Sequence, residues 1–386
     1  MRQEPLMTSK NDPKASQAET QTQTKRKRMD ISDTLCRINQ DLSVFTDQEL
    51  QLNLDLLAST DSENEGLSGI LIYDLAPKWV TYQKVLDVTS EAEYTRYFKV
   101  LGHPFSVTVK AARIRRQGDK EDKLVFPGQS EQIIDDTLRW MSTHGHGQLK
   151  DSAIGAHFSM GNLQSVLKSA NHMMSYKEIY ESLQVLHYSN LRIRDEVSGH
   201  EWSGTFLPTY QNIGADVDVN GDVYRRHWRV TFHDLVNKAM LSTETRMIYW
   251  HTLMSMKNNL AKYIYRRISL VYLQASAGDP YTISLSEIMG GFGKPLEPGK
   301  VLSNPMRDMD RAMKVLAELD VIDEEKTQIK KKKKGRRAYD AIYTFFPGKM
   351  FINQAIEANE ANKLVKTSFT RLENQRRVQS IMKNLT

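Results

Sequence analysis

Hydrophobic and polar positions follow two different periods in the first half of the sequence. Between residues 131 and 190 apolar side chains recur every three or four positions, which predicts successive amphipathic helices. Their apolar faces are Ile133, Ile134, Leu138 and Met141; then Leu163, Val166 and Leu167; then Ile179, Leu183 and Leu186. Residues 191–194 alternate and begin a predicted strand, and Asn220-Gly221 favours a hairpin turn. Residues 131–232 are thus predicted to form a helix, a helix-turn-helix and a strand hairpin.

The same order of elements is predicted again between residues 258 and 346. A long helix is expected over residues 258–274, and Ser284 can cap a short helix that ends at Gly290-Gly291. A third helix follows, which Ser303 or Asn304 can cap and whose first turn suits Pro305. One side of this helix is apolar and consists of Met306, Met309, Met313, Leu316 and Leu319. The opposite side is basic and consists of Arg307, Arg311 and Lys314.

A block of cations lies between two predicted strands after this third helix. The short strand at Val321-Ile322 precedes it, and an aromatic strand over residues 339–346 follows. The block consists of Lys330, Lys331, Lys332, Lys333, Lys334, Gly335, Arg336 and Arg337. A solvated basic run is the simpler interpretation. After an amphipathic helix with a basic stripe, however, the block is typical of the wing of a winged-helix DNA reader, whose cations meet phosphates.

Composition favours an anionic partner and a reducing compartment. The 386 residues carry a net charge of +6, and 40% of them are apolar, enough for real cores. The single cysteine, Cys36, excludes a disulfide framework. No apolar run is long enough for a membrane span or a signal peptide, so we expect a cytoplasmic protein that binds no membrane. Residues 1–30 are polar and predicted to be disordered; their basic end at residues 25–28 suits either a DNA-binding arm or a solubilising tail.

Several motifs resemble catalytic or metal sites but lack residues that such sites require. Residues 216–221 resemble the start of an EF-hand loop, but His227 occupies the position that needs a bidentate glutamate. Residues 290–295 are glycine-rich, yet Pro295 stands where a phosphate loop needs Ser or Thr. His144 and His146 have no evident third metal ligand, and no tyrosine has an activating cluster beside it. We therefore expect no catalytic activity, no metal and no cofactor.

The tandem of predicted winged helices resembles the replication initiators of iteron-type plasmids, the RepA and TrfA group. The resemblance runs over residues 51–346 and rests on the order of elements and on local stretches at 107–140, 176–184 and 241–249. It implies an α+β fold with two tandem winged-helix domains, a disordered N-terminal arm and a helical C-terminal tail. The expected domains are residues 1–69 for the arm, 70–240 and 241–350 for the winged helices, and 351–386 for the tail.

A second motif precedes the first winged helix. It matches the hexapeptide Gln-Leu-x-Leu-x-Leu that binds the bacterial sliding clamp, and the TrfA-type initiators carry such a motif ahead of their DNA-binding domains. The matching residues are Gln51, Leu52, Asn53, Leu54, Asp55 and Leu56. An extended peptide can place its leucines in an apolar pocket while the glutamine amide bonds at the rim. The alternative is a small amphipathic helix, because Leu50, Leu54 and Leu57 share a helical face. We favour the extended clamp-binding peptide.

The sequence thus predicts a replication initiator that binds direct repeats in double-stranded origin DNA and helps to open an adjacent AT-rich region. The resemblance implies the host initiator, the replicative helicase and the sliding clamp as partners, contact with single-stranded AT-rich DNA, and a monomer–dimer equilibrium. The expected DNA contacts are Lys177, Gln184, Arg192, Arg194, Arg307, Arg311, Lys314 and the cations of the 330–337 block. A winged-helix repressor without a role in initiation is the alternative. A nicking or recombining enzyme is a third hypothesis, for which no cluster is found.

Overall fold

The computed structural model describes residues 31–40, 46–59, 66–81, 85–87, 92–115, 120–217, 223–335 and 337–385. From residue 31 onward the chain forms one connected unit. The predicted disordered arm over residues 1–30 lies outside the described residues.

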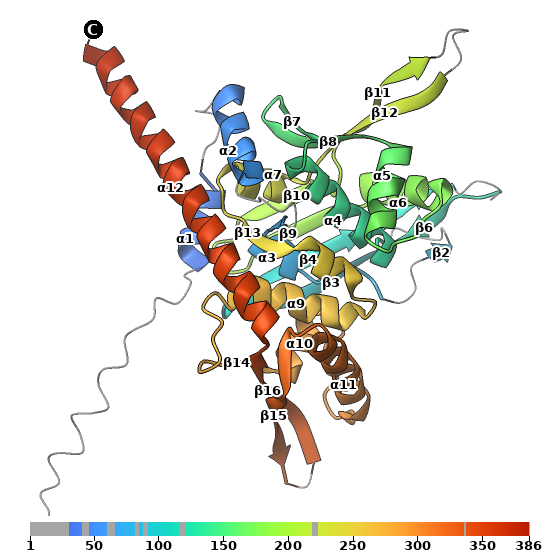
Figure 1. Cartoon of the computed structure of the whole chain (residues 1–386). Helices are drawn as coiled ribbons and strands as arrows, with labels where there is room; N and C mark the ends of the chain where they lie inside the picture. Colours follow the sequence, from blue (N-terminus) through green and yellow to red (C-terminus); the bar gives the residue numbers. More distant parts are fainter. Residues whose placement is uncertain are drawn as a thin grey trace, which may run out of the picture. The chain divides into compact units, whose positions relative to one another are not determined.

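The fold is α+β, with several small antiparallel sheets and a long C-terminal helix, as predicted (Figure 1). The helices are α1 (Ile31–Ile38), α2 (Asp47–Ser59), α3 (Leu71–Leu75), α4 (Gln129–Thr143), α5 (Met160–Ser169), α6 (Tyr176–Tyr188), α7 (Asp234–Leu241), α8 (Trp250–Ser255), α9 (Asn259–Val271), α10 (Leu285–Gly291), α11 (Ser303–Glu318) and α12 (Lys349–Leu385). The strands are β1 (Gly66–Gly69), β2 (Val85–Asp87), β3 (Glu93–Val100), β4 (His103–Lys110), β5 (Ala112–Ile114), β6 (Lys123–Val125), β7 (Gly147–Lys150), β8 (Ala153–Ser159), β9 (Asn190–Asp195), β10 (Glu201–Thr205), β11 (Tyr210–Val217), β12 (Val223–Thr231), β13 (Arg246–Tyr249), β14 (Tyr281–Ser284), β15 (Ile322–Lys334) and β16 (Arg337–Pro347).

The first unit, which we define as α3 to α7, contains the helix-turn-helix α5–α6. Ser159 and Ser175 cap the two helices, and the hydroxyl of Ser175 accepts a hydrogen bond from the amide of Glu178. The predicted inward residues Ile179, Leu183 and Leu186 are fully buried. These caps and apolar positions are local signals, which is why both helices could be predicted from the sequence.

The hairpins of the first unit are arranged differently from a simple wing. Strand β9 pairs with β10 on one side and β4 on the other, inside the sheet β10-β9-β4-β3. The ribbon β11–β12 instead belongs to the sheet β11-β12-β8-β7 and extends away from it (Figure 1). The predicted turn at Asn220-Gly221 lies outside the described residues, but Val217 and Val223 pair on either side of it, as a hairpin requires.

The second unit, which we define as α9 to β16, has the order helix, strand, helix-turn-helix and two-stranded wing. Its sheet has the order β14-β16-β15. Ser284 caps α10 as predicted, because its hydroxyl accepts a hydrogen bond from the amide of Glu287 at 3.2 Å. The core side of α11 is formed by Met309, Ala312, Met313 and Leu316, all buried. The predicted cap of α11 was wrong: the residue before the helix is Leu302, which makes no side-chain cap, and Ser303 is already helical.

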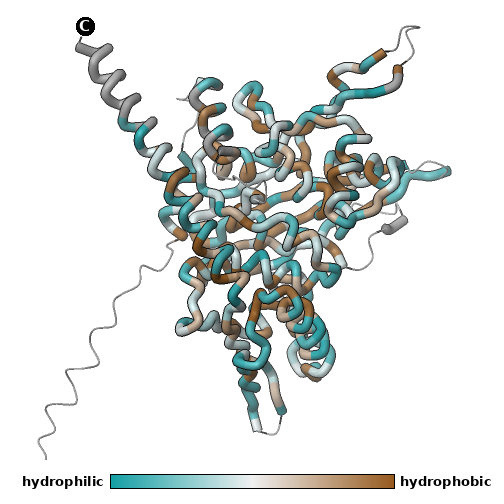
Figure 2. Tube along the Cα trace, in the orientation of Figure 1, coloured by the Kyte–Doolittle hydropathy of each residue, from teal (hydrophilic) through white to brown (hydrophobic). Residues whose placement is uncertain are grey.

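The basic block differs in conformation from the predicted hairpin tip. Strand β15 does not end at Ile322 but continues through all five lysines to Lys334, paired with β16. The turn follows at Gly335, whose φ of +63° favours glycine. Pairing with the apolar strand β16 keeps the lysine run extended, so the cations line a ribbon rather than crowd its end. Figure 2 shows this ribbon as hydrophilic toward its outer end. Arg336 lies outside the described residues.

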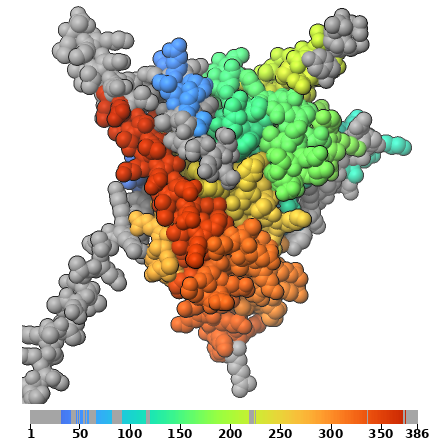
Figure 3. All heavy atoms as spheres, in the orientation of Figure 1, coloured from blue at the N-terminus to red at the C-terminus, as the bar shows by residue number. Residues whose placement is uncertain are grey.

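Helices α1 and α2 lie within the span predicted as an arm, and both pack on the folded unit. Helix α1 contacts α7, while α2 contacts β7, α7 and α12. In Figure 3 the C-terminal helix runs as a red ridge close to the blue α2. The predicted helical tail is therefore a packed element that begins at Lys349, and it buries Phe351, Val365 and Phe369. The domain boundaries themselves stay predictions. Among the described residues, no helix combines the length and the apolarity needed to cross a membrane.

Candidate nucleic-acid interface

The outward side of α11 carries the predicted basic stripe. Arg307, Arg311 and Lys314 are all exposed. The guanidinium of Arg307 donates to the side-chain oxygen of Asn304 at 3.1 Å, and Arg311 lies 3.9 Å from a carboxylate oxygen of Asp308. Both partners are at the surface, where such contacts are weak and easily exchanged for a phosphate. The stripe can therefore meet an anionic ligand at little cost.

The wing places its lysines beside this helix's partner, α10. Lys330 to Lys334 are exposed, and the ammonium of Lys332 lies 4.0 Å from the Asp340 carboxylate. Asp340 is buried and accepts hydrogen bonds from the backbone amide and the hydroxyl of Ser286, at 3.0 and 2.9 Å. One carboxylate thus joins the wing strand β16 to the first turn of α10. The guanidinium of Arg337, at the tip, donates to the carbonyl oxygen of Gly299.

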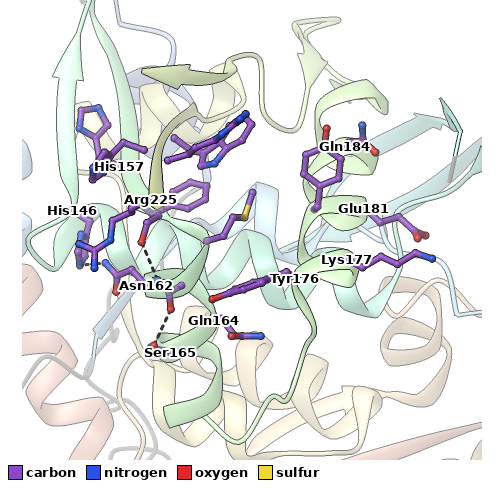
Figure 4. A pocket seen from close by; sticks show the side chains of 18 of the residues that line it. His146, His157, Asn162, Gln164, Ser165, Tyr176, Lys177, Glu181, Gln184 and Arg225 are labelled. Carbon is purple, nitrogen blue, oxygen red and sulfur yellow. Dashed lines mark hydrogen bonds between the residues drawn. The ribbon is translucent and has the colours of Figure 1, made fainter. Parts of the chain in front are cut away.

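In the first unit, an open cleft of about 1650 Å³ lies between the helix-turn-helix and strand β12. Lys177 and Gln184 of α6, two of the predicted DNA contacts, line it. Figure 4 shows them on one side, with His157 and Arg225 across the cleft. The other lining residues include Arg115, His146, Asn162, Tyr176, Tyr180, Glu181, Arg226, His227 and Trp228.

The cleft does not include the other two cations predicted for this unit. Arg192 and Arg194 are exposed on β9, and Arg192 lies 3.9 Å from the carboxylate of Glu201 on β10. The structure therefore brings together Lys177 and Gln184 but places Arg192 and Arg194 on a different strand surface. They were predicted as DNA contacts at the start of a strand, and this strand, β9, is an interior strand of a four-stranded sheet.

Sequence reasoning missed the cations that β12 brings to the cleft. Arg225 and Arg226 are exposed and follow the hairpin turn directly. Asp216 of β11 lies 2.9 Å from His227 and 3.9 Å from Arg225, so the acidic hairpin that imitated a calcium loop partly balances these cations. The signal was present as the basic run 225–227 after a turn, the same arrangement that marked the second wing. It was interpreted only as an alternating strand.

Two histidines of the cleft, His146 and His157, add little positive charge at neutral pH. Partial burial lowers the pKa of His146, and burial together with the charge of Arg229 lowers the pKa of His157. The cleft also carries the charges of Lys177 and of its arginines. Aromatic faces accompany them: Trp228 stacks on Tyr210 with centroids 4.8 Å apart, and Tyr176 and Tyr180 are exposed on α6. Cations interleaved with aromatic rings suit contacts with phosphates and bases.

The motifs rejected from the sequence have other roles in the structure. His144 bonds the carbonyl oxygen of Trp140 at 2.6 Å, while His146 faces Asn162 at 3.3 Å. No group of three potential metal ligands occurs among the residues that the structure describes. Gly291 allows close packing of α10 on Tyr263, which a side chain would block.

The predicted clamp-binding hexapeptide lies in helix α2 and is not extended. The amide nitrogen of Gln51 donates to the Asp55 carboxylate at 2.8 Å, and its oxygen accepts a hydrogen bond from the amide of Leu149 at 3.1 Å. Leu52 is 49% exposed. The side chains of Asn53, Leu54 and Leu56 lie outside the described residues. The conformation is thus the amphipathic helix that was the alternative interpretation, and binding to a clamp would require its glutamine to leave Leu149.

Comparison with known proteins gives structural matches only. No protein-family model matches the sequence, and no curated protein matches it. A crystal structure of a selenomethionine derivative of domains 2 and 3 of RctB matches 72% of this chain and 99% of that chain, with a TM-score of 0.41 and 8% identity. Another crystal structure of the RctB domains 2–3 matches 71% of this chain and 98% of that chain, with a TM-score of 0.39 and 8% identity.

Proposed function

We propose that this chain is a DNA-binding replication initiator that grips one duplex with both winged-helix units. The observation that carries the proposal is the repeated pairing of a helix-turn-helix with a basic β ribbon. In the second unit, α11 presents Arg307, Arg311 and Lys314 beside the lysine-lined wing. In the first unit, α6 faces the cleft opposite Arg225 and Arg226 of β12. A recognition helix can enter the major groove while the ribbon beside it holds the phosphates.

The proposed mechanism uses binding energy rather than nucleotide hydrolysis. Two linked reading units raise each other's effective concentration on a shared site, so the pair binds more tightly than either alone. A protein that bends the duplex to fit both units makes an adjacent AT-rich stretch easier to unpair. Direct repeats, each occupied by one molecule, would accumulate this strain beside that stretch. The protein bound beside this stretch would then recruit the host initiator and the helicase to it.

The double variant Arg307→Ala/Arg311→Ala tests the DNA-binding assignment of α11. We expect it to abolish retardation of origin DNA in a gel while circular dichroism shows a folded protein. A matched control, Lys363→Ala/Arg371→Ala, removes two exposed cations from α12 and should retain retardation. Unchanged binding by the α11 variant would exclude this helix as the reading element.

The clamp hexapeptide distinguishes an initiator from a transcription repressor with the same DNA-binding units. We propose that residues 51–56 bind the sliding clamp after α2 unfolds locally, because the match to the clamp motif stands although the segment is helical here. A clamp pull-down should fail with Gln51→Ala/Leu52→Ala. Absence of clamp binding by the unmodified protein would favour the repressor.

A third hypothesis, a nicking enzyme, is tested by incubating the protein with supercoiled origin DNA and Mg²⁺. We expect the DNA to stay supercoiled. Nicked products would overturn the assignment as a non-catalytic initiator.

A further inference from the structure

Two adjacent arginines in α9 bond in opposite directions, one to each winged-helix unit. The side chain of Arg266 is 2% exposed and that of Arg267 is 5% exposed, although both carry a full charge. Arg266 contacts carboxylates of the first unit, whereas Arg267 contacts groups of the second. Successive residues of a helix project about 100° apart, so a single turn of α9 can serve both units.

Arg266 bridges two elements of the first unit. One guanidinium nitrogen donates to the Asp74 carboxylate of α3 at 2.6 Å and to Asp136 of α4 at 3.0 Å, and the other donates to Asp136 at 2.5 Å. Arg139 of α4 donates to the same two carboxylates at 2.8 and 2.7 Å. Two arginines and two aspartates thus share one buried network, which Asp135 joins through Arg139 at 3.3 Å. The planar fork of arginine holds two carboxylates in a fixed bidentate geometry, which the compact ammonium of lysine does not provide.

Arg267 makes the corresponding contacts inside the second unit. Its guanidinium donates to the Tyr281 hydroxyl of β14 at 3.1 Å and to the Glu287 carboxylate of α10. Helix α9 also packs on α11, the helix that carries the proposed reading stripe. Helix α9 thus contacts α11 of the second unit and, through Arg266, the carboxylates of Asp74 and Asp136 in the first unit, while α10 packs directly on β3.

We propose that Arg266, through Asp74 and Asp136, fixes the rotation of the two winged-helix units relative to each other and so determines the spacing of the two half-sites that the protein accepts. The inference rests on the proposed DNA-binding function, and it makes Arg266 a positioning residue that never touches DNA. A rigid pair of readers accepts a narrow range of spacer lengths, because each added base pair rotates the next half-site by about 34–36° on a repeat of about 10–10.5 base pairs. A loosened pair accepts more spacers.

The test compares Arg266→Lys with the unmodified protein on duplexes first selected from a random pool by the unmodified protein. Insertions of one to ten base pairs between the two protected halves give the spacing series. We expect the unmodified protein to lose roughly tenfold or more in affinity at wrong spacings and Arg266→Lys to lose much of that discrimination. The matched control, Arg267→Lys, acts within the second unit, so its affinity should fall equally at every spacing.

A distance measurement separates failure of this inference from failure of the proposed function. Spin labels at Lys168→Cys in α5 and Glu318→Cys in α11, both exposed positions, are placed in a Cys36→Ser background. Without DNA, we expect a narrow distance distribution that Arg266→Lys broadens and Arg267→Lys does not. Should Arg266→Lys fail to fold, the charge-balanced variant Arg266→Met/Asp136→Asn replaces it.

An unchanged distance distribution, or an unchanged spacing preference in a protein that binds DNA, would overturn the inference. If the unmodified protein selects no DNA at all, the proposed function fails. The distance distribution then decides by itself whether Arg266 fixes the two units.

Discussion

Single buried polar residues in this fold are held by hydrogen bonds from distant parts of the chain. His233 is an example: its Nδ1 accepts from the amide of Leu235 at 3.2 Å, so the proton lies on Nε2, which donates to the carbonyl oxygen of Leu191 at 3.2 Å. Burial lowers the pKa of His233 to about 4, because a charged imidazole would lose its hydration. The folded state therefore holds this histidine neutral.

A pH dependence of stability follows from His233. The unfolded chain binds a proton near pH 6.5 while the folded chain does not, so the stabilisation is complete above pH 6.5 and is lost as the pH falls toward 4. The slope from this group approaches about 1.4 kcal/mol per pH unit. Urea unfolding between pH 7.5 and 4.5 measures it. His233→Gln should be less stable at pH 7.5 and should show a shallower slope; an equal slope would assign the dependence to other groups.

The limits of sequence reasoning are clearest at this scale. In α9, Ile264 and Ile268 recur with the helical period and both are buried, because a local period decides which face is apolar. The sequence did not indicate that the cations of the same helix are buried. Arg266 is neutralised by Asp74 and Asp136, which are 192 and 130 positions away in the sequence. Only the folded chain brings such partners together, and a basic residue on a helix is otherwise expected at the surface.

Among the elements, α10 shows how one missing side chain sets a helix contact. A Cβ at Gly291 would lie 1.8 Å from the hydroxyl oxygen of Tyr263 on α9, whereas a Cβ at Gly290 meets nothing within 4 Å. Glycine is therefore required for packing at position 291, whereas position 290 has room for a side chain.

Gly291→Ala should destabilise the protein by about 1–3 kcal/mol, because the buried Tyr263 has to move. Gly290→Ala should be neutral or stabilising by up to about 1 kcal/mol, since alanine favours a helix over glycine. Urea unfolding of both variants measures the difference. Equal stability of the two would mean that α10 can shift freely on α9.

The β15–β16 ribbon should act through its charge. In the triple variant Lys330→Gln/Lys331→Gln/Lys333→Gln, Lys332 is retained because it lies near Asp340. We expect the slope of log affinity against log salt to become shallower by about 0.9 for every phosphate that the variant no longer neutralises. A titration at several salt concentrations measures the slope. Removing Lys349, Lys363 and Arg371 of α12 in the same way should leave it unchanged.

At this scale the sequence predicted the two helix-turn-helix motifs and both ribbons but not how the ribbons pair. A capping residue such as Ser175 or Ser284 lies next to the helix that it begins, so the sequence alone indicates where each helix starts. Strand β9 was predicted only as the start of a strand, and its partner β4 ends some 80 residues earlier and occupies one edge of β9. Strand pairing is non-local, and alternating residues alone do not identify the partner.

Across the whole molecule, α12 ties the last part of the chain to β13 and to the segment that follows α9. Asn359 accepts a hydrogen bond from the Arg246 guanidinium at 2.8 Å and donates to the carbonyl oxygen of Leu273 at 2.6 Å. Arg246 is buried, and burial lowers its pKa to about 10, so the guanidinium depends on such partners.

Asn359→Ala should cost about 1–3 kcal/mol, because it leaves a buried cation and a carbonyl group without this partner. Limited proteolysis should also cut α12 earlier than in the unmodified protein. Glu360→Ala, at the exposed neighbouring position, is the control and should change neither result. Equal proteolysis of the two variants would indicate that the apolar face of α12 alone holds the helix.

The pairing of β1 with β13 has a consequence for the order of events during synthesis. Residues 66–69 find their strand partner at residues 246–249, and α2 just before them rests partly on α12, which begins at Lys349. Strand β1 and helix α2 therefore rest on surfaces that are synthesised well after them, and α12 is the last of these surfaces to appear. Until α12 has been made, the hexapeptide at residues 51–56 lacks part of the folded surface that holds α2, so a newly made chain presents this motif more openly than a finished one.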